Sequence, residues 1–187
     1  MIYLIGDTHF GHGNIIRFCN RPYTSVKEMT GALIANWNSV VNHEDTVYHL
    51  GDVGHRASGG YLRGIMAQLN GTKILIRGNH DKGQEHMANL GFAAVLEKAV
   101  IRHITSNYLL QHYPIRGNAL REILEENEFA GLIHGHVHNN DGDDIYNGFA
   151  MNVSAEVIDY TPISLDVLHK GFTTHCAKNG LFLNGIR

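Results

Sequence analysis

Side chains that commonly bind metal ions stand at the ends of β-type segments spread over most of this 187-residue chain. Their carboxylate, amide and imidazole groups can each donate an electron pair to a cation. Strand ends that converge on one edge of a sheet are where α/β proteins place their chemistry. The seven candidates are Asp7, His9, Asp52, Asn79, His112, His136 and His138.

Two motifs hold their polar residues two positions apart, as Asp7-Thr8-His9 and His136-Val137-His138. On an extended backbone this spacing puts both side chains on one face, so each pair can bind one ion together. Asp52 adds a carboxylate whose two oxygens can bridge two cations. Glycine precedes several of the candidates and permits sharp turns or positive φ, which would keep the backbone close to the ions.

The candidate ligands supply oxygen and nitrogen but no thiolate. This composition excludes a structural zinc site of the cysteine type and favours Mn²⁺, Fe²⁺, Ni²⁺, Co²⁺ or Zn²⁺ in an open, catalytic geometry. Mg²⁺ and Ca²⁺ would prefer fewer imidazoles. We therefore expect a centre for two divalent metal ions, with Mn²⁺ as the leading candidate.

The first half of the chain alternates β-type and helical patterns, which predicts a parallel sheet with right-handed crossovers. Ser25 and Glu28 form a capping box ahead of an apolar face that repeats at helical spacing. The expected strands are 2–6, 46–50 and 73–77. The expected helices begin near Asn14, with Ile15, Ile16 and Phe18 inward, at Ser25, and at Tyr61, the last ending near Leu69.

The second half has a different sequence pattern, in which two strands follow each other without a helix. It predicts a second sheet, and we expect both sheets to belong to one domain that spans residues 1–187. Strands at Val95–Ile104 and Asn107–His112 are separated only by Thr105 and Ser106, which suggests a hairpin. The other expected elements are a helix at Ala119–Glu126 capped by Asn118, strands at Gly131–Gly135 and Phe149–Val153, and a short helix at Ser164–His169.

Composition limits the classes of function. A formal charge of −3 gives no general attraction to nucleic acid or to anionic membranes. No apolar run approaches the ~18 residues that a membrane helix needs. Cys19 and Cys176 lack metal-site spacing and fit free thiols in a reducing compartment, so we expect a cytoplasmic protein.

The order of these motifs over residues 1–155 resembles the calcineurin-like metallophosphoesterase superfamily. The shared motifs are Asp-x-His, Gly-Asp, Gly-Asn-His-Asp, a single His and Gly-His-x-His. The segments 7–16, 20–23 and 152–156 are similar to a small bacterial and phage branch. The resemblance implies an α/β fold of two mixed sheets packed as a sandwich between helices. No cap domain is visible in the sequence.

The resemblance also implies two sets of metal ligands that share Asp52. One set would be Asp7, His9, Asp52 and His138, and the other Asp52, Asn79, His112 and His136. A hydroxide shared by the two ions would be the nucleophile, since two dications lower the pKa of bound water and hold the oxygens of an in-line displacement.

Further roles follow from the same resemblance. His80 would stabilise the transition state or protonate the leaving oxygen, and Asp81 could orient His80 through its other ring nitrogen. Candidate substrate contacts are His12, Asn14, Arg21 and Arg56. Arginine suits bidentate phosphate contact. Around Arg56, however, the flanking residues depart from the pattern of protein phosphatases.

The predicted function is hydrolysis of a small phosphate ester, with a slight preference for phosphodiesters. The main alternative is a phosphomonoesterase or protein phosphatase. The formal net charge of −3 weighs against a nuclease, because it does not attract nucleic acid. A non-catalytic metal-binding scaffold is disfavoured because every ligand position is intact. The sequence leaves the oligomeric state open.

Overall fold

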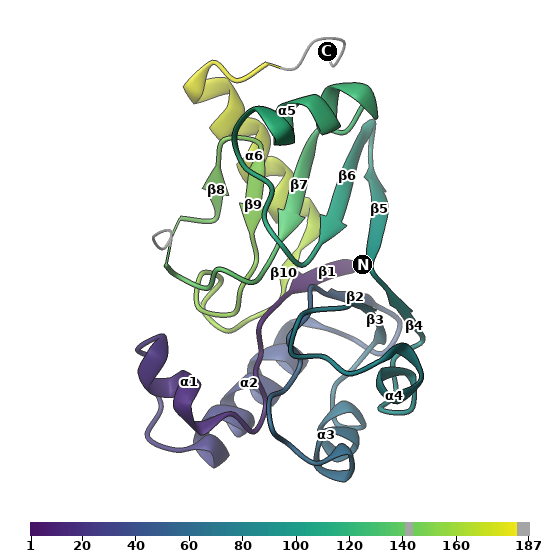
Figure 1. Ribbon diagram of the computed structural model, residues 1–187, viewed down its shortest axis with the longest axis vertical. Coiled ribbons are helices and arrows are strands. Elements are labelled where there is room, and N and C mark those ends of the chain that lie inside the picture. Colours follow the sequence, from purple (N-terminus) through teal and green to yellow (C-terminus); the bar gives the residue numbers. More distant parts are fainter. Residues whose placement is uncertain (141–143, 183–187) are drawn as a thin grey trace.

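In the computed structural model, residues 1–140 and 144–182 are described, and their strands form two five-stranded sheets (Figure 1). The first sheet has the order β10 (Ile163–Ser164), β1 (Ile2–Ile5), β2 (Thr46–His49), β3 (Thr72–Ile76) and β4 (Ala94–Leu96). The second has the order β5 (Lys98–His103), β6 (Ser106–Gln111), β7 (Gly131–His134), β9 (Ala150–Asn152) and β8 (Tyr146–Asn147). Both sheets mix parallel and antiparallel pairs, so the predicted fold class is confirmed.

The segment Val95–Ile104 is two strands rather than the single strand that we expected. The chain leaves the first sheet at Glu97: β4 pairs parallel with β3, whereas β5 pairs antiparallel with β6. The hairpin of β5 and β6 is therefore confirmed, but the strand before it belongs to the other sheet. A continuous β-type pattern carries no information about which sheet each half joins.

The helices are α1 (Gly13–Phe18), α2 (Val26–Val40), α3 (Gly59–Met66), α4 (Gln84–Ala88), α5 (Gly117–Glu126) and α6 (Leu165–Asn179). Ser25 caps α2 as predicted, its hydroxyl accepting the N–H of Glu28 at 3.2 Å. The Glu28 carboxylate accepts from the backbone N–H of Thr24.

Several expected helix details are wrong. Helix α5 begins after Arg116 rather than after Asn118, and its first residue, Gly117, has a positive φ. Helix α6 runs ten residues past His169, through a polar stretch with a weak apolar pattern. Phe18 is 68% exposed rather than inward. Helix α4 was not predicted.

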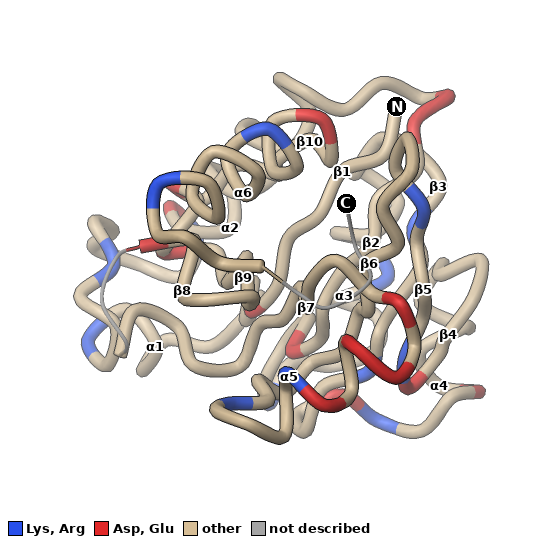
Figure 2. Tube along the Cα trace, turned by 90° about the horizontal axis from the view of Figure 1, so that it is seen from above, with Lys and Arg blue, Asp and Glu red and all other residues tan. Residues whose placement is uncertain are grey.

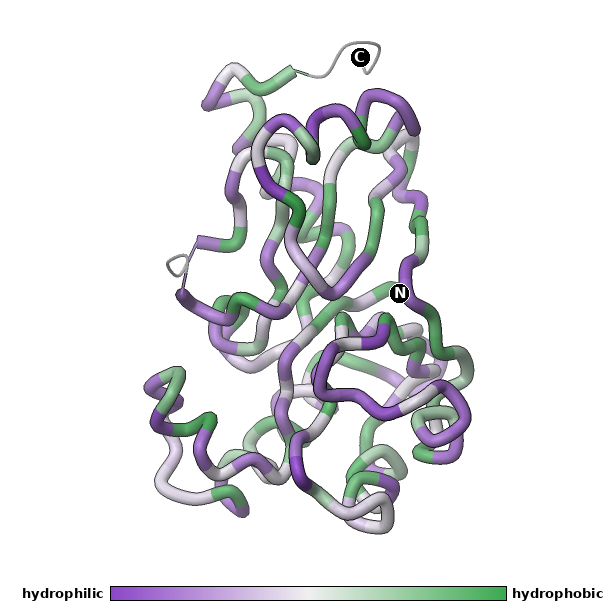
Figure 3. The backbone as a smooth tube through the Cα atoms, in the orientation of Figure 1, coloured by the Kyte–Doolittle hydropathy of each residue, from purple (hydrophilic) through white to green (hydrophobic). Residues whose placement is uncertain are grey.

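The main hydrophobic core lies between the two sheets and continues beneath α2 and α3. On β6 and β7 alternate side chains face opposite ways: Tyr108, Leu110 and Ile133 join this core. Leu109 and Leu132 join a smaller core under α5. Figure 3 shows hydrophobic strands passing into hydrophilic turns. Burial of apolar side chains on both faces of β6 and β7 stabilises these strands. The polar residues therefore lie at the ends of the strands.

The two sheets meet at the carboxyl end of β1. The N–H of Gly6 donates to Val153 at 2.7 Å, and the N–H of Ala155 donates to Gly6 at 3.0 Å. This junction brings the ends of β1, β2 and β3 to those of β6 and β7. Lys and Arg are interspersed with Asp and Glu over several elements (Figure 2). No helix among the described residues is long and apolar enough to cross a membrane.

Candidate metal centre

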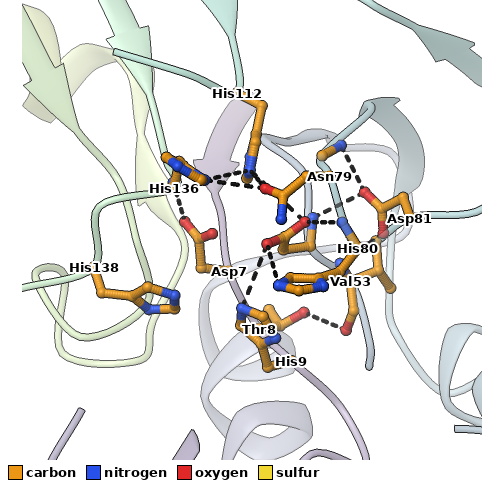
Figure 4. Close-up of polar contacts among 12 residues, drawn as sticks. Asp7, Thr8, His9, Val53, Asn79, His80, Asp81, His112, His136 and His138 are labelled. Atoms are coloured by element: carbon orange, nitrogen blue, oxygen red, sulfur yellow. Dashed lines mark hydrogen bonds and ion pairs between the residues drawn. The ribbon is translucent and has the colours of Figure 1, made fainter. Parts of the chain in front are cut away.

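All seven predicted ligands gather where the two sheets meet (Figure 4). Each follows the carboxyl end of a strand: β1, β2 and β3 in the first sheet, and β6 and β7 in the second. In Figure 4, Asp7 lies between His136 and His138. The side chains form two clusters. The first cluster is Asp7, His9 and His138, and the second cluster is Asp52, Asn79, His112 and His136.

The second cluster has its donor atoms at distances that suit ligands around one ion. The Asn79 Oδ1 lies 3.0 Å from His112 Nε2 and 3.1 Å from His136 Nδ1, and the two imidazole nitrogens are 3.2 Å apart. The Asp52 Oδ1 is 3.7 Å from His112 Nε2. Tetrahedral ligands at metal–nitrogen bond lengths would lie roughly 3.4 Å apart. The donors therefore fit a cation.

The first cluster is more deeply buried and holds polar atoms that need a partner. Among the described residues, Asp7 Oδ1 and both ring nitrogens of His9 are buried without a hydrogen bond. Buried polar atoms are normally satisfied, so these atoms also fit a cation. The Asp52 Oδ2 lies 3.6 Å from His9 Nε2. Asp52 thus reaches both clusters, as a bridging carboxylate would.

The backbone that presents these side chains is unusual. Five of the seven candidate ligands have φ between 50° and 73°, in the left-handed region: Asp7 55°, His9 50°, Asp52 56°, His136 73° and His138 51°. Such conformations are uncommon outside glycine and gather at functional sites. We expected the neighbouring glycines to supply positive φ, and Gly51 does. Gly78 instead provides space, because a Cβ there would collide with Asp52.

Burial dominates the electrostatics of the first cluster. It raises the pKa of Asp7 to about 6 and lowers the pKa of His9 far below its usual range. Burial also opposes protonation of His138, but hydrogen bonds to Cys19 and Glu156 outweigh it and raise the pKa of His138 to about 10. A cation that enters must displace a proton from His138 and, below about pH 6, from Asp7, so metal binding is expected to strengthen as pH rises.

Comparison with known proteins identifies the family. The family model described as the calcineurin-like phosphoesterase superfamily domain matches residues 1–153. The chain belongs to this superfamily. The superfamily is generally one of metal-dependent phosphoester hydrolases, which agrees with the Asp and His clusters of this structure.

Relatives come from archaea, phages and bacteria. Uncharacterized protein MJ1445 of Methanocaldococcus jannaschii is 41% identical, over 90% of this chain and 89% of its own length. Gene 66 protein of Mycobacterium phage L5 is 26% identical, over 73% and 76%. A crystal structure of a protein of unknown function, AQ665 from Aquifex aeolicus, is 34% identical with a TM-score of 0.74, covering 92% of this chain and 99% of that one.

His80 stands beside the second cluster with its side chain 38% exposed. Its Nε2 is 3.9 Å from Asp52 Oδ2, and its backbone N–H donates to Asp52 Oδ1 at 2.9 Å. The side chain therefore faces the metal-ligand region from a partly open position. This placement suits the predicted role toward the phosphoryl group, which stays a prediction.

Asp81 does not orient His80 as we expected. Its carboxylate accepts the backbone N–H groups of Asp52 at 2.8 Å, Val53 at 3.0 Å and Gly78 at 2.8 Å. Both oxygens are thus used to tie the turn after β2 to the turn after β3. Asp81 positions the backbone of Asp52, and the prediction that it acts as the partner of His80 is wrong.

A cavity of about 510 Å³ adjoins the first cluster and His80. Three of the four predicted substrate contacts line it, namely His12, Asn14 and Arg56. The His55 ring adjoins both His12 and His80, with ring centroids 4.5 and 4.4 Å apart. His55 was not predicted as a site residue. Its position four residues before α3 gives no periodic signal that would separate it from a loop histidine.

Arg21 is the predicted substrate contact that the structure contradicts. Its side chain is fully buried, and every guanidinium nitrogen already donates a hydrogen bond within the protein. Glu156, which accepts two of these bonds, was also missed as a site residue. The only sequence signal at Glu156 is the similarity of segment 152–156 to one branch of the superfamily. Nothing in its spacing indicates a contact with residue 21.

Proposed function

We propose that this chain hydrolyses phosphate esters with two divalent metal ions, with Mn²⁺ as the leading candidate and a slight preference for phosphodiesters. The observation that supports this proposal most is the meeting of seven oxygen and nitrogen donors from five strand ends. Two divalent ions would lower the pKa of a shared water and neutralise phosphoryl oxygens during an in-line displacement.

The protein's own groups suit such a reaction. His80 lies close enough to Asp52 to face a bound phosphoryl group from the cavity side. From there it could donate a proton to the leaving oxygen. Arg56 and Asn14 line the same cavity and could bind the remaining oxygens or the leaving group.

The preference for diesters rests on the cavity beside the ligand clusters. A volume of about 510 Å³ lies within the range of small-molecule sites and leaves room for the second esterified group. A phosphomonoesterase or protein phosphatase remains the alternative, because Arg56 could contact a terminal phosphate dianion.

A substrate panel tests both the function and the alternative. Metal-free protein reloaded with Mn²⁺ would be assayed on bis-aryl and mono-aryl phosphates, 2′,3′- and 3′,5′-cyclic nucleotides and a phosphopeptide. We expect turnover of the diesters to exceed that of the monoesters. Faster turnover of the mono-aryl phosphate or phosphopeptide would favour the alternative, and no turnover with any metal of the expected group would reject the function.

A further inference from the structure

A buried ion pair lies directly behind the first cluster. Arg21 Nε and Nη2 donate to Glu156 Oε1 at 2.9 and 2.7 Å, and both side chains are almost completely inaccessible to solvent. Burying two charges is costly unless their geometry and additional hydrogen bonds compensate. The other contacts of the pair therefore indicate its purpose.

Arg21 holds the turn that carries two of the first-cluster residues. Its Nη1 donates to the Thr8 carbonyl at 2.9 Å, and its Nη2 donates to the Asp7 carbonyl at 2.7 Å. Asp7 and His9, on either side of Thr8, both have left-handed backbone conformations. Such conformations persist only where the surroundings enforce them, and the rigid guanidinium supplies two fixed donors to this turn.

Glu156 extends the same support to the third residue of the cluster. Its Oε1 also accepts a hydrogen bond from His138 Nδ1 at 3.0 Å. An ionised carboxylate only accepts, so Nδ1 carries a hydrogen in this contact, and Nε2 is the nitrogen that a cation can bind once its proton leaves. A histidine ligand commonly has a carboxylate in this role, which fixes its tautomer and ring orientation.

The same atoms have another possible use, because Cys19, His138 and Glu156 also lie within reach of one common ion. Two observations oppose a cation there. The positively charged Arg21 guanidinium already forms an ion pair with Glu156 Oε1. His138 Nδ1 donates its hydrogen to the same oxygen. The arrangement therefore favours support of the first cluster over a separate metal site.

We propose that Arg21 and Glu156 are a positioning pair that assembles Asp7, His9 and His138 into one metal site. The Arg21 guanidinium fixes the turn after β1. Through Glu156 it also fixes His138, which lies in the segment after β7. The inference rests on the proposed function only in that the first cluster binds a metal ion. Neither Arg21 nor Glu156 is expected to touch substrate.

Metal titration of Glu156→Gln tests the pair without using hydrolysis. Metal-free protein would be titrated with Co²⁺, with heat and the visible spectrum of the bound ion as readouts. We expect two binding steps in the unchanged protein. In Glu156→Gln one step should weaken by ~10–100-fold, the usual effect of removing a residue that orients a ligand, while the other step changes by less than about twofold.

A second background shows which site is affected. His112→Gln removes a donor of the second cluster and should leave a single binding step at the first. Adding Glu156→Gln there should weaken that remaining step by a similar factor. Glu97→Gln is the matched control, since it removes the partner of Arg77 from an exposed pair with a 2.7 Å contact, and it should leave both steps unchanged.

Glu156→Gln leaves the buried charge of Arg21 unpaired and could destabilise the fold. The double variant Arg21→Met/Glu156→Leu controls for this effect, because it removes both buried charges together. It too should weaken the first-cluster step. Unchanged binding in either folded variant would overturn the inference. So would a third bound Co²⁺ that disappears in Glu156→Gln, since this would assign Glu156 as a ligand. Intact two-step binding without hydrolysis of any phosphate ester would instead reject the proposed function and leave the inference standing.

Discussion

The two ligand clusters share Asp52 but are held in place by different means. The second cluster depends on backbone contacts: Asp81 accepts the N–H groups of Asp52 and Gly78, and His112 Nδ1 contacts the Leu50 carbonyl at 2.7 Å. The first cluster depends on a buried ion pair of side chains far apart in the sequence, Arg21 and Glu156.

This difference separates support by groups within the ligand-bearing turns from support by residues outside those turns. The second cluster is stabilised mainly by groups within the strand-end turns that carry its ligands. The first cluster needs the segment after α1 that carries Arg21, the turn after β1 and the segment after β9 to be folded together before its ligands are fixed. We therefore expect the first metal site to be the more easily disturbed by changes outside its ligands. Three substitutions test the comparison, beginning with the largest effect.

Asp52→Asn should disrupt both clusters at once, because Asp52 is within 3.6 Å of His9 and 3.7 Å of His112. Hydrolysis of a bis-aryl phosphodiester with Mn²⁺ should fall by at least ~10³-fold, since losing even one electrostatic group in an active site costs ~10²–10³-fold. Metal analysis should show fewer than two ions per chain.

The same substitution should leave the metal-free fold intact. Asp52 is a buried carboxylate close to Asp7 and Asp81, and removing its charge relieves repulsion between them. Circular dichroism and thermal unfolding in chelator would check this. Near-normal turnover in Asp52→Asn would show that no shared carboxylate is needed, and the division into two clusters joined at Asp52 would then be wrong.

The position of the ligands within strand-end turns explains which parts of the site could be predicted from sequence. The ligands follow β-type segments directly, and Gly-Asp and Gly-Asn-His-Asp are contiguous, so their placement required only that parallel strand ends converge. The roles of Arg21 and Glu156 could not be predicted, because their contact exists only after β1 and β9 meet at Gly6. Asp81 was misassigned because adjacency to His80 does not show where a carboxylate points.

The fold shows the same limit. Alternation of strands and helices over the first half predicted the parallel pairing that β1, β2 and β3 show. The exit of the chain at Glu97 into the second sheet was not predicted, since it depends on which partner strand is free to pair. The length of α6 was also missed, because packing of Leu168 and Phe172 stabilises a helix whose sequence pattern is weak.

His80→Ala sharpens the comparison at the boundary of the second cluster. We expect kcat to fall by ~10²–10⁴-fold, as for loss of a general acid, while two metal ions remain bound. His86→Ala on α4, which does not line the cavity, is the control and should keep full activity. Loss of one ion in His80→Ala would make this residue a ligand and would enlarge the second cluster.

The smallest effect concerns His49, which supports the first cluster through Thr8. The His49 Nε2 lies 2.9 Å from Thr8 Oγ1, whose own hydrogen is donated to the Val53 carbonyl. The hydroxyl oxygen must therefore accept a hydrogen from Nε2, which fixes a neutral tautomer. Burial, together with the smaller effect of the charge of His112, lowers the pKa of His49 to about 3. Thr8 links Asp7 to His9, and protonation of His49 would add a hydrogen to Nδ1, which is buried without a hydrogen-bond partner among the described residues. An unpaired charge would then lie beneath the turn that carries both ligands.

The direction in which the free energy of unfolding changes with pH follows from proton binding. Between pH 6.5 and pH 3 the unfolded chain binds a proton at this histidine and the folded chain does not, so the free energy of unfolding falls as pH drops below about 6.5. At pH 5 the loss is about 2 kcal/mol, from 1.5 pH units at 1.36 kcal/mol each.

His49→Gln keeps a donor to Thr8 but cannot titrate. Urea unfolding in chelator should therefore show a smaller fall from pH 7.5 to pH 5 in His49→Gln, by about 2 kcal/mol, with His43→Gln in an exposed loop as control. Equal falls in the unchanged protein and both variants would mean that the support beneath the first cluster does not depend on a neutral His49, and that Arg21 and Glu156 hold this turn without it.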